Sequence, residues 1–167
     1  DVWPPRLTLG GRNLGDVWRH HLLADSEITA ELVPFHKLTQ WLTYSLLEPL
    51  EEAGFQVQDI DLLTGLPEYR NGGLFFDTGV LELKKPDEID ALHPVSSELI
   101  VEWRALTVIL LDRLGEQLRE KMGLASEELP LPRILQGGTW STGRKLAYEH
   151  RPDGSPPLRV ESDGTVF

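Results

Sequence analysis

Apolar residues recur at helical spacing in the segment that follows Pro34. They stand three or four positions apart, which is the period of an α-helix with one apolar face. The pattern predicts a helix that Pro49 kinks or ends and that Gly54 closes. The apolar positions of this helix are Phe35, Leu38, Leu42, Leu46, Leu50 and Ala53.

The strongest helical pattern covers residues 98–122. Ser96 or Ser97 precedes it as a capping residue, and Gly123 follows it as a stop signal. Its apolar positions fall on one stripe, while charged residues lie elsewhere, so we expect this stripe to form the core. The stripe consists of Trp103, Leu106, Leu110, Leu114 and Leu118.

Weaker patterns complete the predicted fold. Helices are expected over residues 74–83 and 133–149, the latter interrupted near Gly137 and Gly138, with a short helix from Asn13 or Gly15. Residues 158–160 and 165–167 are expected to pair as a terminal hairpin. These elements indicate a single, mainly α domain over residues 1–167 with minor β structure at its ends.

Composition narrows the possible functions. The chain has 167 residues and no cysteine, which excludes a disulfide framework. Its net charge of −11 disfavours duplex nucleic acid and membrane surfaces as partners. Neither a membrane span nor a leader is recognisable, so we expect a cytoplasmic protein. Because the chain begins with Asp1 and its one methionine is Met122, we interpret it as a piece of a longer protein.

Four polar residues are the first candidates for chemistry. Lys37 adjoins an apolar stripe, and Glu68, Tyr69 and Arg70 stand between Pro67 and a glycine pair. A carboxylate near two cations is expected to have a pKa below its usual range, and such an anion can stabilise a developing cation or activate a water molecule. The alternative is a surface ion pair between Glu68 and Arg70 at a turn.

A second candidate is the run over residues 138–145, which contains Thr139, Trp140 and Arg144. It lacks the Lys-Ser/Thr pair of a nucleotide-binding P-loop. A glycine-rich entry to a helix with two following cations could still cradle a phosphate, whereas a tight packing turn is the alternative. Trp140 and Trp41 lie beside polar clusters, so either could stack on a planar ligand or simply pack.

A third candidate is a metal site. Asp16 and His20, four residues apart, would share one helix face and could bind a metal together with His36. Packed, hydrogen-bonded histidines are the more common arrangement, so we expect no metal and no cofactor.

Several long strings resemble one family. The sequence is similar to the C-terminal half of the URC-four/Urg-three family of uracil-catabolism proteins over essentially its whole length. The matching strings are VPFHK (33–37), WLTYS (41–45), GLPEYRNGG (65–73), VEWRA (101–105), LQGGTW (135–140) and ESDGTVF (161–167). Members are about twice as long, so the resemblance implies that an N-terminal half of the same protein is missing here.

This resemblance implies a role in a pyrimidine-degradation route that passes through ribosylated intermediates and releases urea, and hence cleavage of an N-ribosyl bond. A weaker resemblance is to queuosine-nucleotide N-glycosidases, and it is carried by residues 35–37, Gln40 and residues 68–70 and 79–81. Those enzymes have a helical DNA-glycosylase-like fold, which the resemblance therefore implies for this chain. They carry an aspartate where Glu68 stands here.

Together these observations predict an N-glycosidase-like hydrolase that acts on a small ribosylated intermediate of uracil degradation, with or without a 5′-phosphate. Glu68 and Tyr69 would be the catalytic residues. The substrate-binding residues would be Lys37, Arg70, Asn71, Trp41, Thr139, Trp140 and Arg144. The alternatives are a non-catalytic partner or scaffold in the same pathway, and a metal-assisted amidohydrolase that uses Asp16, His20 and His36.

Overall fold

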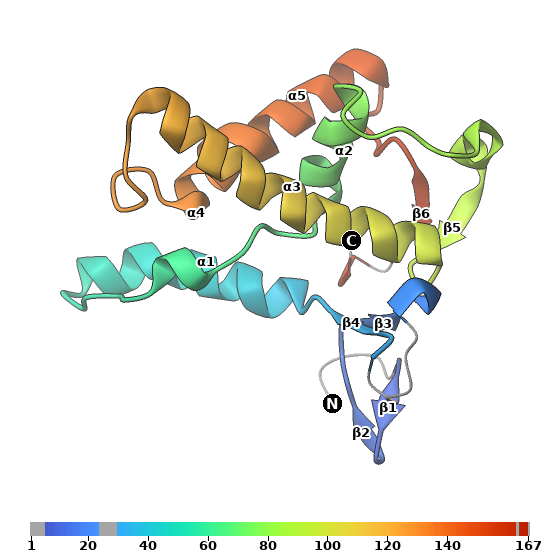
Figure 1. The fold of residues 1–167 in the computed structure, drawn as a ribbon, viewed down its shortest axis with the longest axis horizontal. Helices are drawn as coiled ribbons and strands as arrows, with labels where there is room; N and C mark the ends of the chain where they lie inside the picture. The colour runs from blue at the N-terminus through green and yellow to red at the C-terminus, as the bar shows by residue number, and fades with distance from the viewer. Residues whose placement is uncertain (1–5, 24–29, 163, 167) are drawn as a thin grey trace.

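The computed structural model describes residues 6–23, 30–162 and 164–166, and helices form most of its regular structure (Figure 1). This confirms the expected mainly α fold with minor β structure. The longer helices are α1 (Lys37–Glu52), α2 (Tyr69–Asp77), α3 (Glu98–Met122) and α5 (Trp140–His150). Shorter helical turns are η1 (His21–Leu23), η2 (Ile60–Leu62), η3 (Pro86–Asp90), α4 (Leu131–Ile134) and the π-helical η4 (Leu135–Thr139).

Helix α3 crosses the middle of the molecule and carries the core (Figure 1). The Ser97 hydroxyl accepts a hydrogen bond from the N–H of Ile100, and Gly123 ends the helix with a φ of 66°, as the sequence predicts. Trp103 is buried as expected, but the other members of the predicted stripe are only half-buried. The buried line lies beside them and includes Ile100, Thr107 and Leu111.

Helix α2 lies between α3 and α5, and two glycines permit this close packing. A Cβ atom on Gly72 would lie 2.7 Å from the Thr107 hydroxyl oxygen of α3. A Cβ atom on Gly143 of α5 would lie 2.1 Å from the Arg70 carbonyl oxygen of α2. Because neither neighbour can move that far without disturbing a helix, glycine is required at both contacts.

Within the described residues, three two-stranded sheets flank the helices. β1 (Thr8–Leu9) and β2 (Arg12–Asn13) pair antiparallel, as do β3 (Val17–Arg19) and β4 (Leu32–Pro34), with Trp18 opposite Val33. β5 (Leu92–Pro94) and β6 (Arg159–Glu161) pair parallel. The short helix predicted after Asn13 is therefore wrong, since tertiary pairing with β4 places residues 17–19 in a strand. The predicted terminal hairpin is also replaced by the β5–β6 pair, while Asp163 and Phe167 lie outside the described residues.

Helix boundaries differ from the sequence predictions in three places. α2 begins at Tyr69 rather than residue 74, because Glu68 caps it, and it ends before Gly79. α1 continues through Pro49 to Glu52, and the chain then turns at Gly54, whose φ is 85°. Residues 131–150 form one helical stretch whose glycine-rich interruption is a π-helical turn.

A buried ion pair joins the strand region to α1 and α3. Both carboxylate oxygens of Asp16 accept hydrogen bonds from Arg104, each at 2.8 Å. The Trp18 indole N–H also donates to Asp16, at 2.7 Å, and the Lys37 backbone N–H donates at 3.0 Å. Asp16 thereby caps the start of α1 and neutralises an arginine on α3 that has no exposed surface.

No helix in residues 6–23, 30–162 or 164–166 combines the length and the apolar character required to cross a bilayer.

Replacement of Asp16 tests the importance of this ion pair. Asp16→Asn is expected to lower the free energy of unfolding by about 3 kcal/mol or more, because Arg104 would remain buried without its counter-charge. Urea denaturation measures the change. As the control, Lys145→Ala removes an exposed pair with Glu149, 3.7 Å long, and should cost less than about 1 kcal/mol. Equal effects of the two variants would contradict a structural role for Asp16.

The same pair predicts a pH dependence. Burial raises the pKa of Asp16, but the hydrogen bonds and charge of Arg104 outweigh it and hold the pKa below its ordinary value. The unfolded state therefore takes up a proton at higher pH than the folded state, so this contribution is lost as the pH falls below about 4. When the pH is lowered from neutral to below about 4, the free energy of unfolding should therefore fall less in the Asp16→Asn variant than in the unchanged chain.

Candidate functional site

Glu68 stands at the N-terminus of α2 with an extended backbone, at φ −119° and ψ 140°. Its Oε2 atom accepts hydrogen bonds from the backbone N–H groups of Arg70, at 2.9 Å, and Asn71, at 3.4 Å. Among the described residues, no hydrogen bond involves Oε1. A helix N-terminus favours an anion, so the fold orients this carboxyl group and leaves one oxygen for another partner.

The environment of Glu68 combines burial with two positive charges. Burial raises the pKa of its carboxyl group above the usual value, while the Arg70 N–H bond and the charges of Lys37 and Arg70 partly oppose that rise. The expectation of a lowered pKa is wrong, because loss of hydration outweighs the two cations. Lys37, buried at the start of α1, is close enough to Glu68 for its charge to act on that carboxyl group.

The Arg70 guanidinium contacts two aromatic rings. Its guanidinium carbon lies 4.8 Å from the centre of the Tyr69 ring and 5.6 Å from that of the Trp140 ring. Its Nη1 atom is buried and has no hydrogen-bond partner among the described residues. Buried polar nitrogens are normally paired, so this atom is a candidate contact for a ligand oxygen.

Helix α5 and the π-helical turn before it supply the other side of the cluster. The Arg144 guanidinium carbon lies 5.7 Å from the Trp140 ring centre, so one indole contacts two arginines. The Thr139 hydroxyl donates to the side-chain oxygen of buried Asn71 at 3.0 Å. The structure thus brings seven predicted site residues together where α2 meets η4 and α5: Glu68, Tyr69, Arg70, Asn71, Thr139, Trp140 and Arg144.

The glycine-rich run over residues 138–145 does not form the phosphate cradle that its sequence suggests. Helical structure begins at Leu131 and continues through this run, so the run is not a free helix N-terminus. Its second glycine, Gly143, packs on the backbone of Arg70, which is the packing alternative. In the sequence, a glycine followed by residues that favour a helix indicates a close packing contact. The sequence does not indicate which segment packs there.

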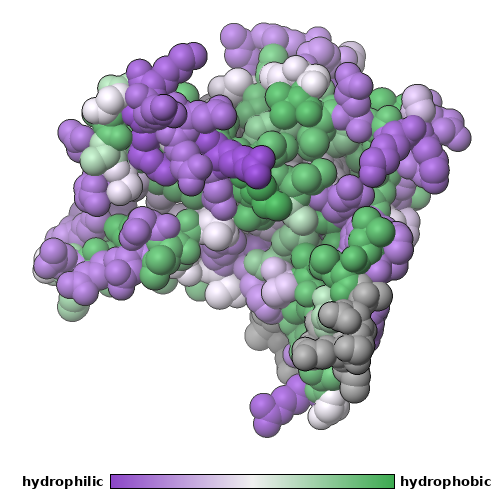
Figure 2. All heavy atoms as spheres, viewed as in Figure 1, coloured by the Kyte–Doolittle hydropathy of each residue, from purple (hydrophilic) through white to green (hydrophobic). Residues whose placement is uncertain are grey.

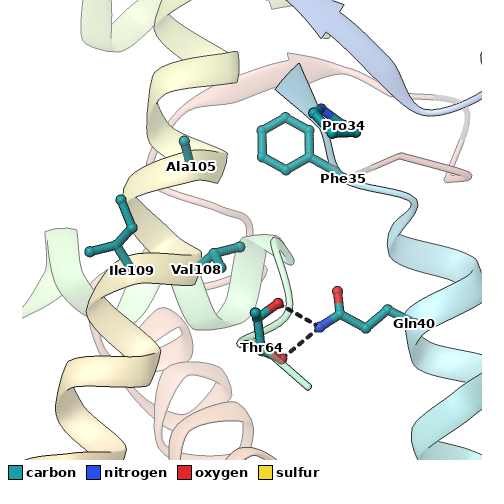
Figure 3. A pocket seen from close by; sticks show the side chains of 7 residues that line it. All are labelled: Pro34, Phe35, Gln40, Thr64, Ala105, Val108 and Ile109. Atoms are coloured by element: carbon teal, nitrogen blue, oxygen red, sulfur yellow. Dashed lines mark hydrogen bonds between the residues drawn. The ribbon is translucent and has the colours of Figure 1, made fainter. Parts of the chain in front are cut away.

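Trp41 does not join the cluster through any of its described contacts, and its side chain is exposed on α1. Beside α1 lies a cleft of about 240 Å³ lined by Pro34, Phe35, Gln40, Thr64, Ala105, Val108 and Ile109 (Figure 3). Pro34 of β4, Phe35 and Gln40 of α1 face α3 across this cleft, which has an apolar wall. Neither Glu68 nor Arg70 lines it.

The alternative metal set is wrong for the described residues. No group of three or more acidic or histidine side chains there could hold a metal ion. Asp16 directs both oxygens at Arg104, and it lies before a strand rather than on a helix face shared with His20. His36 is exposed at the start of α1 with a φ of 48°.

Comparison with known proteins identifies the family. Residues 1–167 match the family described as "Protein of unknown function (DUF1688)". The chain belongs to this family. It is 48% identical over 172 residues to Protein urg3 of Schizosaccharomyces pombe and 41% identical over 189 residues to Uracil catabolism protein 4 of Lachancea kluyveri. These findings confirm the family resemblance.

The match covers 99% of this DUF1688 chain in both cases but only 41% and 42% of the two relatives. The chain therefore spans about two fifths of the length of the curated relatives it matches. No solved structure matches it.

The α2–α5 contact of this DUF1688 chain can be tested by adding one methyl group. Gly143→Ala is expected to lower the free energy of unfolding by about 1–3 kcal/mol, because the new Cβ would overlap the Arg70 carbonyl oxygen. Gly137→Ala is the matched control, since nothing lies within 4 Å of the Cβ that it would add. Thermal or urea unfolding that ranks both variants equally would contradict the close contact.

Proposed function

We propose that the chain carries the catalytic carboxyl group of a hydrolase that cleaves the N-ribosyl bond of an intermediate in uracil degradation. One observation supports this most: Glu68 is held at a helix N-terminus, within the electrostatic reach of Lys37 and Arg70. A buried carboxyl group with a raised pKa beside specific charge partners is typical of acid–base sites. The names of the two relatives support the pathway, because one is called a uracil catabolism protein.

The reaction needs few groups. The bond between ribose C1′ and nitrogen breaks, water supplies the new oxygen on C1′, and one proton of that water passes to the departing nitrogen. Positive charge develops on the ribose ring in the transition state. Glu68, as an anion, would either stabilise that charge or accept a proton from the attacking water.

The surrounding residues fit the binding of an anionic sugar. Arg70 and Lys37 would hold a 5′-phosphate or ribose hydroxyls, and the buried Nη1 atom of Arg70 offers an N–H group that lacks an acceptor among the described residues. Tyr69 contacts the Arg70 guanidinium through its ring and would help to orient the site. Trp140, which contacts both Arg70 and Arg144 and is 38% exposed, would offer an aromatic surface to a planar urea or base.

A non-catalytic scaffold role in the same pathway is the alternative, and the exposed apolar surface of α1 favours it. Measured hydrolysis of an N-ribosyl bond by the full-length protein would distinguish the hydrolase from the scaffold. The DNA-glycosylase-like fold is part of the same proposal, and a solved structure of the full-length protein would test it.

Glu68→Gln in a full-length family protein is the direct test of catalysis. With ribosylurea 5′-phosphate as the trial substrate, kcat should fall by about 100-fold or more while KM stays within about 3-fold, because the amide keeps the shape and loses the charge. Glu127→Gln, at an exposed position, is the control. An unchanged kcat in a folded Glu68→Gln variant would overturn the assignment.

The pH profile adds a second readout. Since burial raises the pKa of Glu68, activity that needs its ionised form should decline on the acid side at a pH above the usual 4.5 for glutamate. That acid limb should disappear in the residual activity of Glu68→Gln.

Arg70→Gln tests phosphate recognition. KM for ribosylurea 5′-phosphate should rise by about 10-fold or more, whereas KM for ribosylurea itself should change by less than about 3-fold, because only the phosphate loses a charged partner. Arg113→Gln, on an exposed part of α3, is the matched control. Equal changes for both substrates would contradict recognition of the phosphate by Arg70.

A further inference from the structure

Helix α1 presents leucines to the solvent. Leu42, Leu46 and Leu50 follow one another at four-residue steps and therefore share a face, here called the α1 outer face. Their side chains are 58%, 45% and 38% exposed, although leucine stripes of this kind normally pack against a core. In Figure 2 the α1 segment projects as a lobe at the lower left, where apolar atoms lie among polar ones.

The opposite side of α1 faces the rest of the molecule through Gln40 and Tyr44, and Tyr44 also packs against the apolar core. The Gln40 side-chain amide donates to the carbonyl and hydroxyl oxygens of Thr64 at 2.6 and 2.9 Å (Figure 3). The Tyr44 hydroxyl donates to the same carbonyl oxygen. Gly65, which follows Thr64 in the chain, donates its N–H to the Asp112 carboxylate of α3 at 2.7 Å. Hydrogen bonds through residues 64 and 65 therefore attach α1 to α3, while Leu42, Leu46 and Leu50 face away.

The residues that follow α1 extend the same pattern. Phe55 and Leu62 are also large, apolar and exposed, as is Trp41 within the helix. A monomeric protein rarely exposes so many large apolar side chains in one short stretch of chain unless another surface covers them.

Charge indicates what covers this face. Residues 38–69 contain no lysine, arginine or histidine. Exposed acidic residues accompany the leucines: Glu48, Glu51, Glu52, Asp59 and Asp61. A second copy of the chain would bring acidic residues against acidic residues, whereas an apolar surface edged by lysine and arginine would complement them.

We propose that the α1 outer face is the docking surface for the part of the full-length family protein that lies outside these 167 residues. The two relatives contain such a part, because the match covers 41% and 42% of them and leaves 59% and 58%. The covering surface has an apolar centre and a basic edge. This inference does not depend on the proposed activity.

Amide hydrogen exchange on unaltered proteins is the first test. Amides of α1 should exchange at least about 10-fold more slowly in full-length Protein urg3, at the aligned positions, than in the 167-residue chain, after correction for sequence. Equal protection in the two proteins would overturn the proposal.

Substitutions provide the second test. Leu42→Glu combined with Leu46→Glu should leave the melting temperature of the 167-residue chain near that of Val80→Glu, a control residue that is 57% exposed elsewhere. In full-length Protein urg3, glutamate at both aligned positions should lower the melting temperature by about 5 °C or more, and glutamate at the aligned control position should not. If the double variant fails to fold in the 167-residue chain, or both full-length variants melt alike, the proposal is overturned.

Sedimentation of the 167-residue chain tests whether a second copy of the chain covers the α1 outer face instead. A monomer at micromolar concentration supports the proposal. A dimer that Leu42→Glu with Leu46→Glu dissociates would assign the face to a second copy and overturn it.

Discussion

The buried pair of Asp16 and Arg104 is the constraint on which much of the arrangement depends. Two charges removed from water are tolerated when they are paired and hydrogen-bonded, and here the carboxylate accepts hydrogen bonds from a guanidinium, an indole and a helix N-terminus. Arg104 also donates to the Val166 carbonyl oxygen at 3.1 Å. Its guanidinium carbon lies 4.1 Å from the centre of the Phe35 ring. One arginine on α3 thereby ties together the strand region, the start of α1 and the end of the described chain.

This constraint reaches the candidate site through Lys37. Lys37 donates its backbone N–H to the Asp16 carboxylate. The contact that holds the start of α1 therefore also fixes the backbone position of Lys37. Helix α2 supplies Glu68 and Arg70, and its position is set by the glycine contacts with α3 and α5. The electrostatic contact between Lys37 and Glu68 therefore depends on two separate packing arrangements.

Helix α1 links the two proposals made for this chain. Its first residue, Lys37, acts electrostatically on Glu68, while its outer face carries the exposed leucines. The helix is attached to the rest of the molecule by hydrogen bonds through residues 64–65 and by the packing of Tyr44 against the core. Docking of the remaining family protein would bury those leucines and restrain the helix that carries the lysine.

The sequence by itself determined the local structure where periodicity and capping agree. The helix over residues 98–122 and its glycine stop follow from spacing and backbone preference, which act over a few residues. The group at residues 68–71 was also evident, since its members are adjacent. Tertiary structure decided what depends on distant partners: the strand at residues 17–19, the parallel partner of β6, the burial that raises the pKa of Glu68 and the glycine contact at Gly143. It also decided which side of α1 faces inward, because a leucine stripe specifies an apolar contact but not the surface that provides it.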